Sequence, residues 1–417
     1  MATWKENASK IILLDNGSYE IKHSKPTLKK NYKFHNAKFF NKTSGSSFSS
    51  STPFFIQDIS KDYPKENISA IGRNFLRPLS RGLLGDIDIQ LDIWEKIFQQ
   101  SYGLNKDDDN IKNSLLIFTY TPMAPDDVME GFFEIIFEYF NFDACIKSIP
   151  HIFTSFYNKL KYPDKINKTV QLVVDSGFSS TTIVPIFNNK PVYNAIKRVE
   201  ISGKLMTNYL KECLSTTIDL DIRKEFFLAN LIKEETCFFS QDFVKDMNIS
   251  KNSETYLSNF ILPEYRHKPP TFFENDKGSK YSVKINNLRF IVPELLFNPN
   301  IIGIDAGGIH EGILSSINEC HKDYKDLLYQ NIITNGGITK LPGFNQRLCN
   351  ELSNSVEYSF VKGVQIFGQE KTGDIYEEPV IEGMKLFAQN NEVIQDLAIT
   401  RNDYEEIGFN IVWKTCL

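Results

Sequence analysis

Two short apolar runs along the chain end in the same kind of polar turn. The first, IILL at residues 11–14, leads into DNGS, which starts at Asp15, and the second, LVV at residues 172–174, leads into DSG, which starts at Asp175. An alternating or apolar segment follows each turn, so each pattern predicts a strand, a tight turn and a return strand. The two aspartates are 160 residues apart. This repetition predicts an internal duplication with two lobes, each opening with one hairpin.

Helices and strands alternate between and after these hairpins. Large apolar side chains at helical spacing predict a helix around residues 91–98, a buried strand is predicted at residues 114–119, and residues 126–142 predict a helix with an aromatic inner face. Farther along, residues 332–335 predict a strand that runs into a diglycine, and an amphipathic helix then extends to Leu352. This order predicts an α/β architecture.

Three polar segments predict loops. Residues 42–53 are rich in serine and predict a mobile loop, and the carboxylates at residues 107–109 predict a solvated loop after a helix. Residues 263–280 are rich in proline, lysine and aromatic residues and predict an insertion. This insertion contains four residues of types that are enriched in interface anchors: Tyr265, Arg266, Phe272 and Phe273. It is therefore a candidate partner contact, with a plain surface loop as the alternative.

Composition limits the classes of protein that fit. A chain of 417 residues with 41% hydrophobic and 24% charged residues fits a soluble globular protein with two domains or one large two-lobed fold. The net charge of −5 gives no global basic field for nucleic acid. Six scattered cysteines form no C-x-x-C pair, and no apolar stretch has the length of a membrane span. We expect an intracellular protein, in the cytosol or the nucleus.

The chemistry of the two turns suits a polyphosphate. Turns with glycine and serine present backbone N–H groups to an anion, and a carboxylate at the end of each preceding strand can hold a hydrated Mg²⁺. Two such turns that face each other would clamp a triphosphate. A single D-x-G is also an ordinary hairpin turn, and the diglycine Gly336-Gly337 alone is also an ordinary strand-to-helix turn. Their occurrence together favours a nucleotide site.

The chain resembles the actin family in three segments that occur in the family's order. LLDNGSYEIK, VVDSGFSSTTIVP and IITNGGITKLPGF resemble the phosphate-1, phosphate-2 and adenosine motifs, and the similarity covers nearly the whole chain. The resemblance implies the duplicated, ribonuclease-H-like actin fold with two lobes and four subdomains. Residues 1–160 and 375–417 would form the outer lobe, and residues 161–374 the inner lobe.

The resemblance also implies ATP with Mg²⁺ as the bound ligand. Asp15 and Asp175 match the carboxylates that face the cation through water. The other implied nucleotide-binding residues are Gly17, Ser18, Tyr19 and Lys22 in the first phosphate loop, Gly177 and Ser179 in the second, and Gly203, Lys233, Glu234, Gly336 and Gly337 around the nucleoside.

The chain departs from the family where hydrolysis needs catalytic groups. Phe178 stands in place of a second aspartate, Thr182 in place of a histidine, and Pro150 in place of the glutamine that orients the attacking water. Because hydrolysis needs a positioned water and a proton acceptor, we expect ATP to bind with little or no turnover, and no enzymatic role. The loop that supports filament contacts in actin is replaced by a short link and GRNFLRPLSRG at residues 72–82, so no filament is expected.

Several segments resemble the sixth class of actin-related proteins, among them DNGSYEIK, DSGFSST and the ending TRNDYEEIGFN. This resemblance implies a nuclear structural subunit of an SWR-type chromatin-remodelling complex, which exchanges a histone dimer for one with a variant histone. The implied partners are a zinc-HIT protein, an insertion of the remodeller's motor subunit, a ring of RuvB-like ATPases and, through the complex, the nucleosome. The alternatives are an actin-like filament-forming ATPase, or a sugar kinase or Hsp70-type ATPase of the same fold.

Overall fold

A computed structural model describes residues 3–5, 7–40, 53–55, 75–105, 108–217, 225–262, 282–355, 363–368, 371–372 and 375–413. The predicted insertion at residues 263–280 lies outside these ranges, as does the serine-rich segment except for Pro53.

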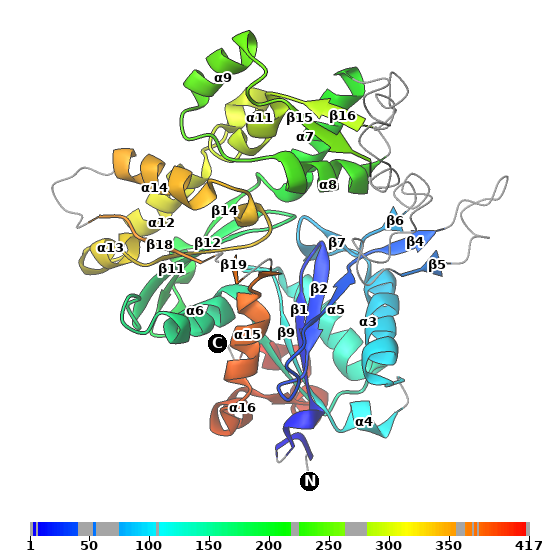
Figure 1. The fold of residues 1–417 in the computed structure, drawn as a ribbon. Coiled ribbons are helices and arrows are strands. Elements are labelled where there is room, and N and C mark those ends of the chain that lie inside the picture. Colours follow the sequence, from blue (N-terminus) through cyan, green and yellow to red (C-terminus); the bar gives the residue numbers. More distant parts are fainter. Residues whose placement is uncertain are drawn as a thin grey trace.

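Two six-stranded mixed sheets form the centres of two lobes (Figure 1). The first has the order β21 (Ile399–Thr400), β10 (Ala144–Ser148), β9 (Leu115–Thr119), β1 (Ile11–Asn16), β2 (Glu20–Ser24) and β3 (Tyr32–His35). The second has the order β13 (Lys190–Pro191), β12 (Thr181–Phe187), β11 (Val170–Ser176), β17 (Ile332–Asn335) and β18 (Ile366–Phe367), and β14 (Lys197–Val199) also pairs with β12.

The duplication predicted from the two turns is confirmed by the strand pairing. Strand β1 lies between the antiparallel β2 and the parallel β9, and β11 lies between the antiparallel β12 and the parallel β17. Strands β1, β9 and β17 are almost wholly buried, as expected for parallel strands that are covered on both faces. Both D-x-G turns therefore sit at equivalent ends of equivalent strands.

Helices cover the faces of both sheets. In the first lobe they are α3 (Ile87–Tyr102), α4 (Asp109–Lys112), α5 (Asp126–Phe133), the π-helix η4 (Glu134–Tyr139), α15 (Pro379–Phe387), α16 (Asn391–Leu397) and α17 (Arg401–Ile407). The others are α6 (Pro150–Lys161), α7 (Gly203–Thr217), α8 (Phe226–Thr236), α9 (Phe243–Asn252), α11 (Leu288–Glu294), α12 (Ile309–Asn318), α13 (Lys322–Tyr329) and α14 (Phe344–Ser355).

Short elements complete the described chain. The strands are β4 (Lys38–Phe40), β5 (Pro53–Phe54), β6 (Phe75–Leu76), β7 (Leu79–Ser80), β8 (Leu83–Leu84), β15 (Ser258–Ile261), β16 (Ser282–Ile285), β19 (Lys371–Thr372) and β20 (Ile375–Tyr376). The 3₁₀ turns are η1 (Thr3–Lys5), η2 (Ala8–Lys10), η5 (Tyr193–Ala195), η8 (Pro299–Ile302), η9 (Ile338–Lys340) and η10 (Gly408–Trp413).

Helices α6 and α15 pack side by side between the two sheets (Figure 1). Helix α15 contacts β1 and β2, and α6 contacts β11, β12 and β17, so this pair joins the lobes. Gly383 lets the helices approach closely, because a Cβ atom there would lie 2.0 Å from the carbonyl oxygen of Phe153. The rings of Phe153 and Phe387 meet edge to face, with centroids 5.6 Å apart, which adds to this contact.

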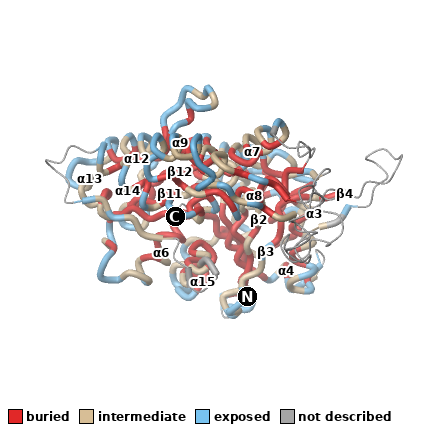
Figure 2. The backbone as a smooth tube through the Cα atoms, turned by 45° about the horizontal axis from the view of Figure 1, so that its top comes forward, coloured by how far each residue is buried: buried red, intermediate tan, exposed pale blue. Residues whose placement is uncertain are grey.

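Buried apolar side chains form clusters around each sheet. Figure 2 shows that the buried residues lie mainly along the central segments of the backbone. Helix α3, predicted from its apolar spacing, buries Ile93, Trp94, Ile97 and Phe98 against the first sheet. It starts where the Asp86 side chain accepts a hydrogen bond of 2.9 Å from the backbone N–H of Ile89. Trp94 Nε1 also donates to Asn16 Oδ1 at 3.3 Å, which connects this core to the first turn.

Two predicted boundaries differ from the structure. The helix expected at residues 126–142 is α-helical only to Phe133 and continues as the π-helix η4, although its aromatic inner face is buried as expected. The acidic segment expected to be a solvated loop contains the N-cap of α4, where Asp108 Oδ1 accepts from the Asn110 backbone N–H at 2.8 Å. A short polar cap of this kind follows from side-chain hydrogen bonding, which a count of charges does not reveal.

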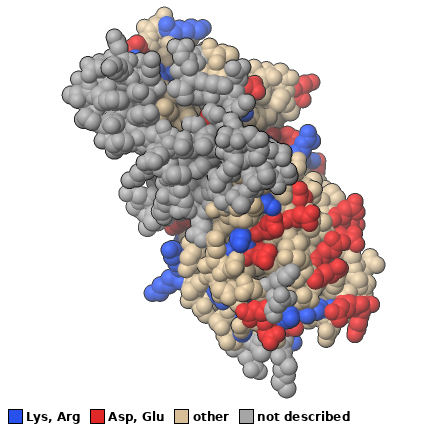
Figure 3. Space-filling model, turned by 90° about the vertical axis from the view of Figure 1, so that its right-hand side faces the viewer, with Lys and Arg blue, Asp and Glu red and all other residues tan. Residues whose placement is uncertain are grey.

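One face of the first lobe carries many carboxylates (Figure 3). Figure 3 shows acidic side chains gathered on the lower part of that face, with few basic side chains among them. No helix in the described ranges is long and apolar enough to cross a membrane. No disulfide joins the five cysteines of these ranges.

Candidate functional site

A cavity of about 230 Å³ lies between the lobes, where the ends of β1 and β11 meet. Every residue predicted from the sequence to bind nucleotide lines it: Asp15, Gly17, Ser18, Tyr19, Lys22, Asp175, Gly177, Ser179, Gly203, Lys233, Glu234, Gly336 and Gly337. The three motifs, which are far apart along the chain, therefore converge on one space. Their role in binding a nucleotide stays a prediction.

The two aspartates face each other from the two sheets. Thr119 Oγ1 on β9 donates a hydrogen bond of 2.8 Å to Asp15 Oδ1, and Asn335 on β17 is hydrogen-bonded to Asp175. Burial raises the pKa of both carboxyl groups above the usual value, Lys22 opposes this for both, and the proximity of Asp175 raises the pKa of Asp15 further.

The two carboxylates are suited to a hydrated cation. A divalent cation would offset the desolvation cost and the mutual repulsion of the two negative charges, which raise their pKa values. Within the described residues, no group of three or more His, Cys, Asp or Glu side chains gathers to hold a metal directly. Two facing carboxylates suit Mg²⁺ that keeps most of its water, and the cation-binding role of Asp15 and Asp175 stays a prediction.

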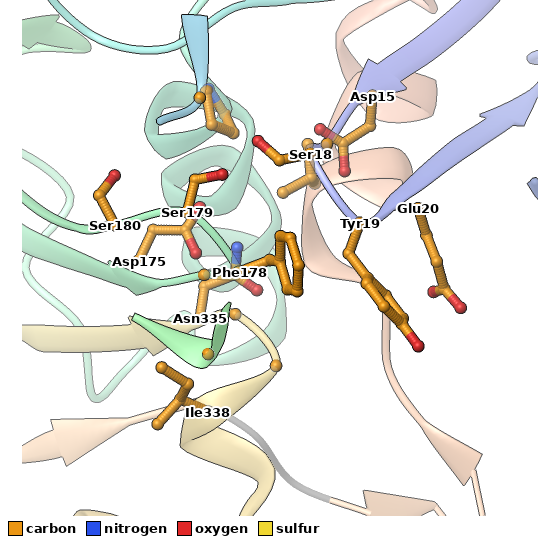
Figure 4. A pocket seen from close by; sticks show the side chains of 18 of the residues that line it. Asp15, Ser18, Tyr19, Glu20, Asp175, Phe178, Ser179, Ser180, Asn335 and Ile338 are labelled. Atoms are coloured by element: carbon orange, nitrogen blue, oxygen red, sulfur yellow. The ribbon is translucent and has the colours of Figure 1, made fainter. Parts of the chain in front are cut away.

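Aromatic contacts close the cleft between the phosphate turns. Phe178 extends from the second turn toward Tyr19 of the first, with ring centroids 5.0 Å apart (Figure 4). The Tyr19 hydroxyl accepts a hydrogen bond of 3.1 Å from Asn230 on α8, in the other lobe. The Arg77 guanidinium lies 4.7 Å from the Phe178 ring centroid and donates to the Ser18 carbonyl oxygen at 2.9 Å. These contacts link the two lobes at the phosphate turns.

The nucleoside side of the cavity is built on α7 and α8. Lys233 Nζ donates to the Gly203 carbonyl oxygen at 3.1 Å and to Thr207 Oγ1 and Asn230 Oδ1 at 2.8 Å each. Burial lowers the pKa of Lys233. Glu234 is exposed on the next position and accepts from Asn230 Nδ2 at 2.8 Å. Lys233 is therefore held by neutral oxygens rather than by a carboxylate.

The three positions where the sequence departs from the family's motifs also line the cavity: Pro150, Phe178 and Thr182. Thr182 Oγ1 is hydrogen-bonded to His151 Nε2 at 2.9 Å, and His151 is wholly buried on α6. Burial lowers the pKa of His151 to about 4. An imidazole with so low a pKa is a weak proton acceptor at neutral pH.

We expect this buried histidine, together with His23, to make the protein sensitive to mild acid. Burial lowers the pKa of each to about 4, from an ordinary 6.5. Between pH 6.5 and 4 the unfolded chain therefore binds protons that the folded chain does not, so stability is full above pH 6.5 and falls as the pH is lowered. At pH 5 each histidine should lower the unfolding free energy by roughly 2 kcal/mol.

Thermal unfolding measured between pH 7.5 and pH 5 tests this. His151→Gln should reduce the pH dependence, because it removes one of the two buried imidazoles. A pH profile of His151→Gln that is as steep as that of the parent protein would contradict the assignment.

Sequence reasoning missed several residues that line the cavity, among them the charged residues Glu20, Lys340 and Glu378. Glu378 precedes α15, and Lys340 follows the diglycine by three residues. Lys340 belongs to the segment IITNGGITKLPGF, which resembles the adenosine motif, so its place in the cavity could have been predicted from the sequence. Glu378 lies in no motif, and only the folded chain brings it next to Lys22.

Comparison with known proteins agrees with this geometry. Residues 57–417 match the family model named Actin, and the chain belongs to the actin family. It is 30% identical to actin-related protein 6 of Arabidopsis thaliana over 365 residues, which cover 80% of this chain and 83% of that protein. It is 28% identical to actin-like protein ARP6 of Yarrowia lipolytica, over 97% of this chain and 96% of the relative. Actin-related protein 6 of Dictyostelium discoideum is 30% identical, over 80% and 81%. Within the family, the chain is thus an actin-related protein of the actin-related protein 6 class.

Proposed function

We propose that this protein is a nuclear structural subunit of an SWR-type chromatin-remodelling complex that binds ATP with little or no hydrolysis. The observation that supports this most is the similarity to actin-related protein 6 over 80 to 97% of the chain. The fold supplies a two-lobed body that a ligand in the cleft would stabilise, because a ligand that binds only the folded state adds to its stability.

The cavity supports ATP with Mg²⁺ as that ligand. The turns that begin at Asp15 and Asp175 would present backbone N–H groups to the phosphates, and these two carboxylates would hold the cation through its water shell. Gly336 and Gly337 would let the nucleoside lie close to the backbone. The bound cation would neutralise phosphate charge in the cleft.

Weak hydrolysis follows from the groups around the phosphate end. Phe178 offers a ring where a carboxylate would order the cation's water, and Pro150 offers no side-chain hydrogen bond to an attacking water. Thr182 contributes a hydroxyl whose neighbour His151 is a weak base. The nucleotide then serves as a structural ligand rather than as a substrate.

The proposed partners follow from the class: a zinc-HIT protein, the insertion of a motor subunit, the RuvB-like ring and, through the complex, the nucleosome. The carboxylate-rich face in Figure 3 would repel DNA phosphates, so it favours contact with proteins over direct contact with DNA on that side. The candidate insertion at residues 263–280 lies outside the described residues, and its role in assembly is part of this proposal. Deletion of these residues without loss of assembly would remove that part.

We expect the purified protein to release ATP or ADP on denaturation, detectable by mass spectrometry, and to show no turnover of added ATP above the background rate. Asp175→Ala removes one cation-facing carboxylate and should reduce the nucleotide content by at least about tenfold. Actin-like turnover that Asp175→Ala abolishes would contradict the non-hydrolysing role. A protein that contains no nucleotide and does not bind added ATP would contradict the nucleotide site.

Assembly needs a separate test. Co-expression with a zinc-HIT protein should give a stable pair on size exclusion, and the protein alone should stay in the supernatant when it is centrifuged with ATP and Mg²⁺. Pelleting under these conditions would favour the filament-forming alternative.

A further inference from the structure

A carboxylate that belongs to none of the nucleotide motifs lies in the cleft next to the phosphate-facing lysine. Glu378 Oε2 is 2.9 Å from Lys22 Nζ, and its Oε1 is 2.7 Å from Lys33 Nζ and 3.6 Å from Lys340 Nζ. The side chain of Glu378 is only 11% exposed. It comes from the residue before α15, one of the two helices that join the lobes. Three lysines from three different elements thus converge on one carboxylate.

Glu378 provides the stronger contact to Lys22. Asp15 Oδ2 is 3.7 Å from Lys22 Nζ, which is beyond hydrogen-bond distance, whereas Glu378 is within it. Lys22 is the residue that the actin resemblance assigns to the phosphates. In this structure its charge is therefore already satisfied by the protein, by a group of the same charge sign as a phosphate.

The carboxylate is firmly ionised. Burial alone would raise the pKa of Glu378, but Lys22, Lys340 and Lys33 overcome burial and hold that pKa well below its usual value. Burial alone would lower the pKa of Lys22, and Glu378 followed by Asp15 raise it instead. Both groups stay charged throughout the physiological pH range, so the contact is a lasting ion pair.

The cavity already carries more carboxylates than lysines, so Glu378 disfavours the binding of a polyphosphate. The lining contains five carboxylates, Asp15, Glu20, Asp175, Glu234 and Glu378, but three lysines, Lys22, Lys233 and Lys340. The cavity volume of about 230 Å³ is also below the roughly 300–1,000 Å³ of typical ligand sites. A triphosphate would therefore have to compete with Glu378 for the positive charge of Lys22 and Lys340.

We propose that Glu378 is an internal anion that takes the place of phosphate on Lys22 when the cleft holds no nucleotide, and that a polyphosphate must displace it. The identity of the displacing ligand, a nucleotide, rests on the proposed function. The stabilising effect of Glu378 does not depend on it. Glu378 thus lowers nucleotide affinity and keeps the lobes closed in the nucleotide-free protein. This regulates the site without any catalytic step.

Three full-length proteins test this: the parent, Glu378→Gln and the matched control Glu377→Gln. Glu377 is the adjacent glutamate and pairs with Lys161 at 2.5 Å, but it does not line the cavity. Without ligand, Glu378→Gln should lower the thermal midpoint by at least about 3 °C, because three lysines lose their shared partner. Inorganic tripolyphosphate should restore that midpoint. A fluorescent ATP analogue with Mg²⁺ should bind Glu378→Gln about tenfold more tightly than the parent. The control should match the parent in affinity for the ATP analogue, and tripolyphosphate should shift its midpoint no more than it shifts that of the parent.

The outcomes separate this inference from the proposed function. If the parent binds the ATP analogue and Glu378→Gln binds it no more tightly, the internal anion is overturned and the nucleotide site stands. If neither protein binds the analogue but tripolyphosphate still restores Glu378→Gln, the nucleotide function is overturned and the internal anion stands. A Glu378→Gln protein that is as stable as the parent without ligand, or that tripolyphosphate does not stabilise, overturns the inference.

Glu378→Asp provides a second variant if Glu378→Gln does not fold. It keeps the charge but shortens the side chain by one methylene, so it reaches the lysines less well. We expect its affinity for the ATP analogue to exceed that of the parent, by less than about tenfold. An affinity equal to or below that of the parent overturns the inference.

Discussion

Gly336→Ala is expected to weaken nucleotide binding strongly and to destabilise the protein. Gly336 has a φ of +101°, where a side chain is strained, and an added Cβ atom would lie 2.3 Å from the Ser176 carbonyl oxygen and 2.6 Å from Asp175 Oδ1. Backbone strain and overpacking of this kind each cost about 1–3 kcal/mol. Because the added methyl group would displace Asp175 and the second phosphate turn, we also expect affinity for an ATP analogue to fall by more than about 100-fold.

Gly337→Ala is the matched control for folding. Gly337 has a φ of −65° and a ψ of −35°, and no heavy atom would lie within 4 Å of an added Cβ. Its chemical denaturation midpoint should therefore equal that of the parent protein, whatever its effect on ligand contact. Equal unfolding free energies for the two variants would show that the close approach at Gly336 does not constrain the fold.

Arg347→Met is expected to lower the unfolding free energy by about 3–5 kcal/mol, because it leaves the buried carboxylate of Glu294 without its partner. Arg347 donates to both oxygens of Glu294, at 3.0 and 2.9 Å, and the two side chains are only 6% and 1% exposed. Arg347 also donates to the Ser240 carbonyl oxygen at 2.6 Å, and the neighbouring Phe239 N–H donates to the Pro342 carbonyl oxygen at 2.8 Å. The ion pair therefore supports the loop after the diglycine.

Urea denaturation of two further proteins distinguishes the unpaired charge from lost packing. Adding Glu294→Gln to Arg347→Met should recover at least about 1 kcal/mol, since no uncompensated charge remains. Glu351→Gln should cost less than about 1 kcal/mol, because this second partner of Arg347 is 30% exposed. A double variant that is less stable than Arg347→Met would contradict the role of the unpaired carboxylate.

A large part of the fold could be predicted from short-range patterns. The runs before Asp15 and Asp175 gave two hairpins, because burial on both faces makes β1 and β11 apolar and turn chemistry then interrupts them. Helix α3 was readable from its apolar spacing. The π-helix that follows Phe133 was not, because a change from α to π bonding leaves the apolar face almost unchanged. The residue boundaries predicted for the two lobes stay a prediction.

The candidate site was predictable only where its residues lie in motifs. The aspartates and glycines of the turns act through local backbone geometry, so their spacing is informative. Phe178 was recognised as a missing carboxylate, but its contact with Tyr19 of the other lobe was not foreseen. The pairing of His151 with Thr182 was also missed. His151 lies on a helix outside the motifs, and only the folded chain brings it next to the strand of Thr182.

The amino-acid sequence by itself determined the duplicated hairpins, the glycine and carboxylate chemistry of the turns, and the family to which they belong. These depend on residues within a few positions of one another, where backbone conformation and side-chain type act directly. The tertiary structure alone decided that Lys22 meets Glu378, a residue more than 350 positions away, and that Phe178 meets Tyr19. Such contacts depend on how two lobes pack about α6 and α15, which no local pattern specifies.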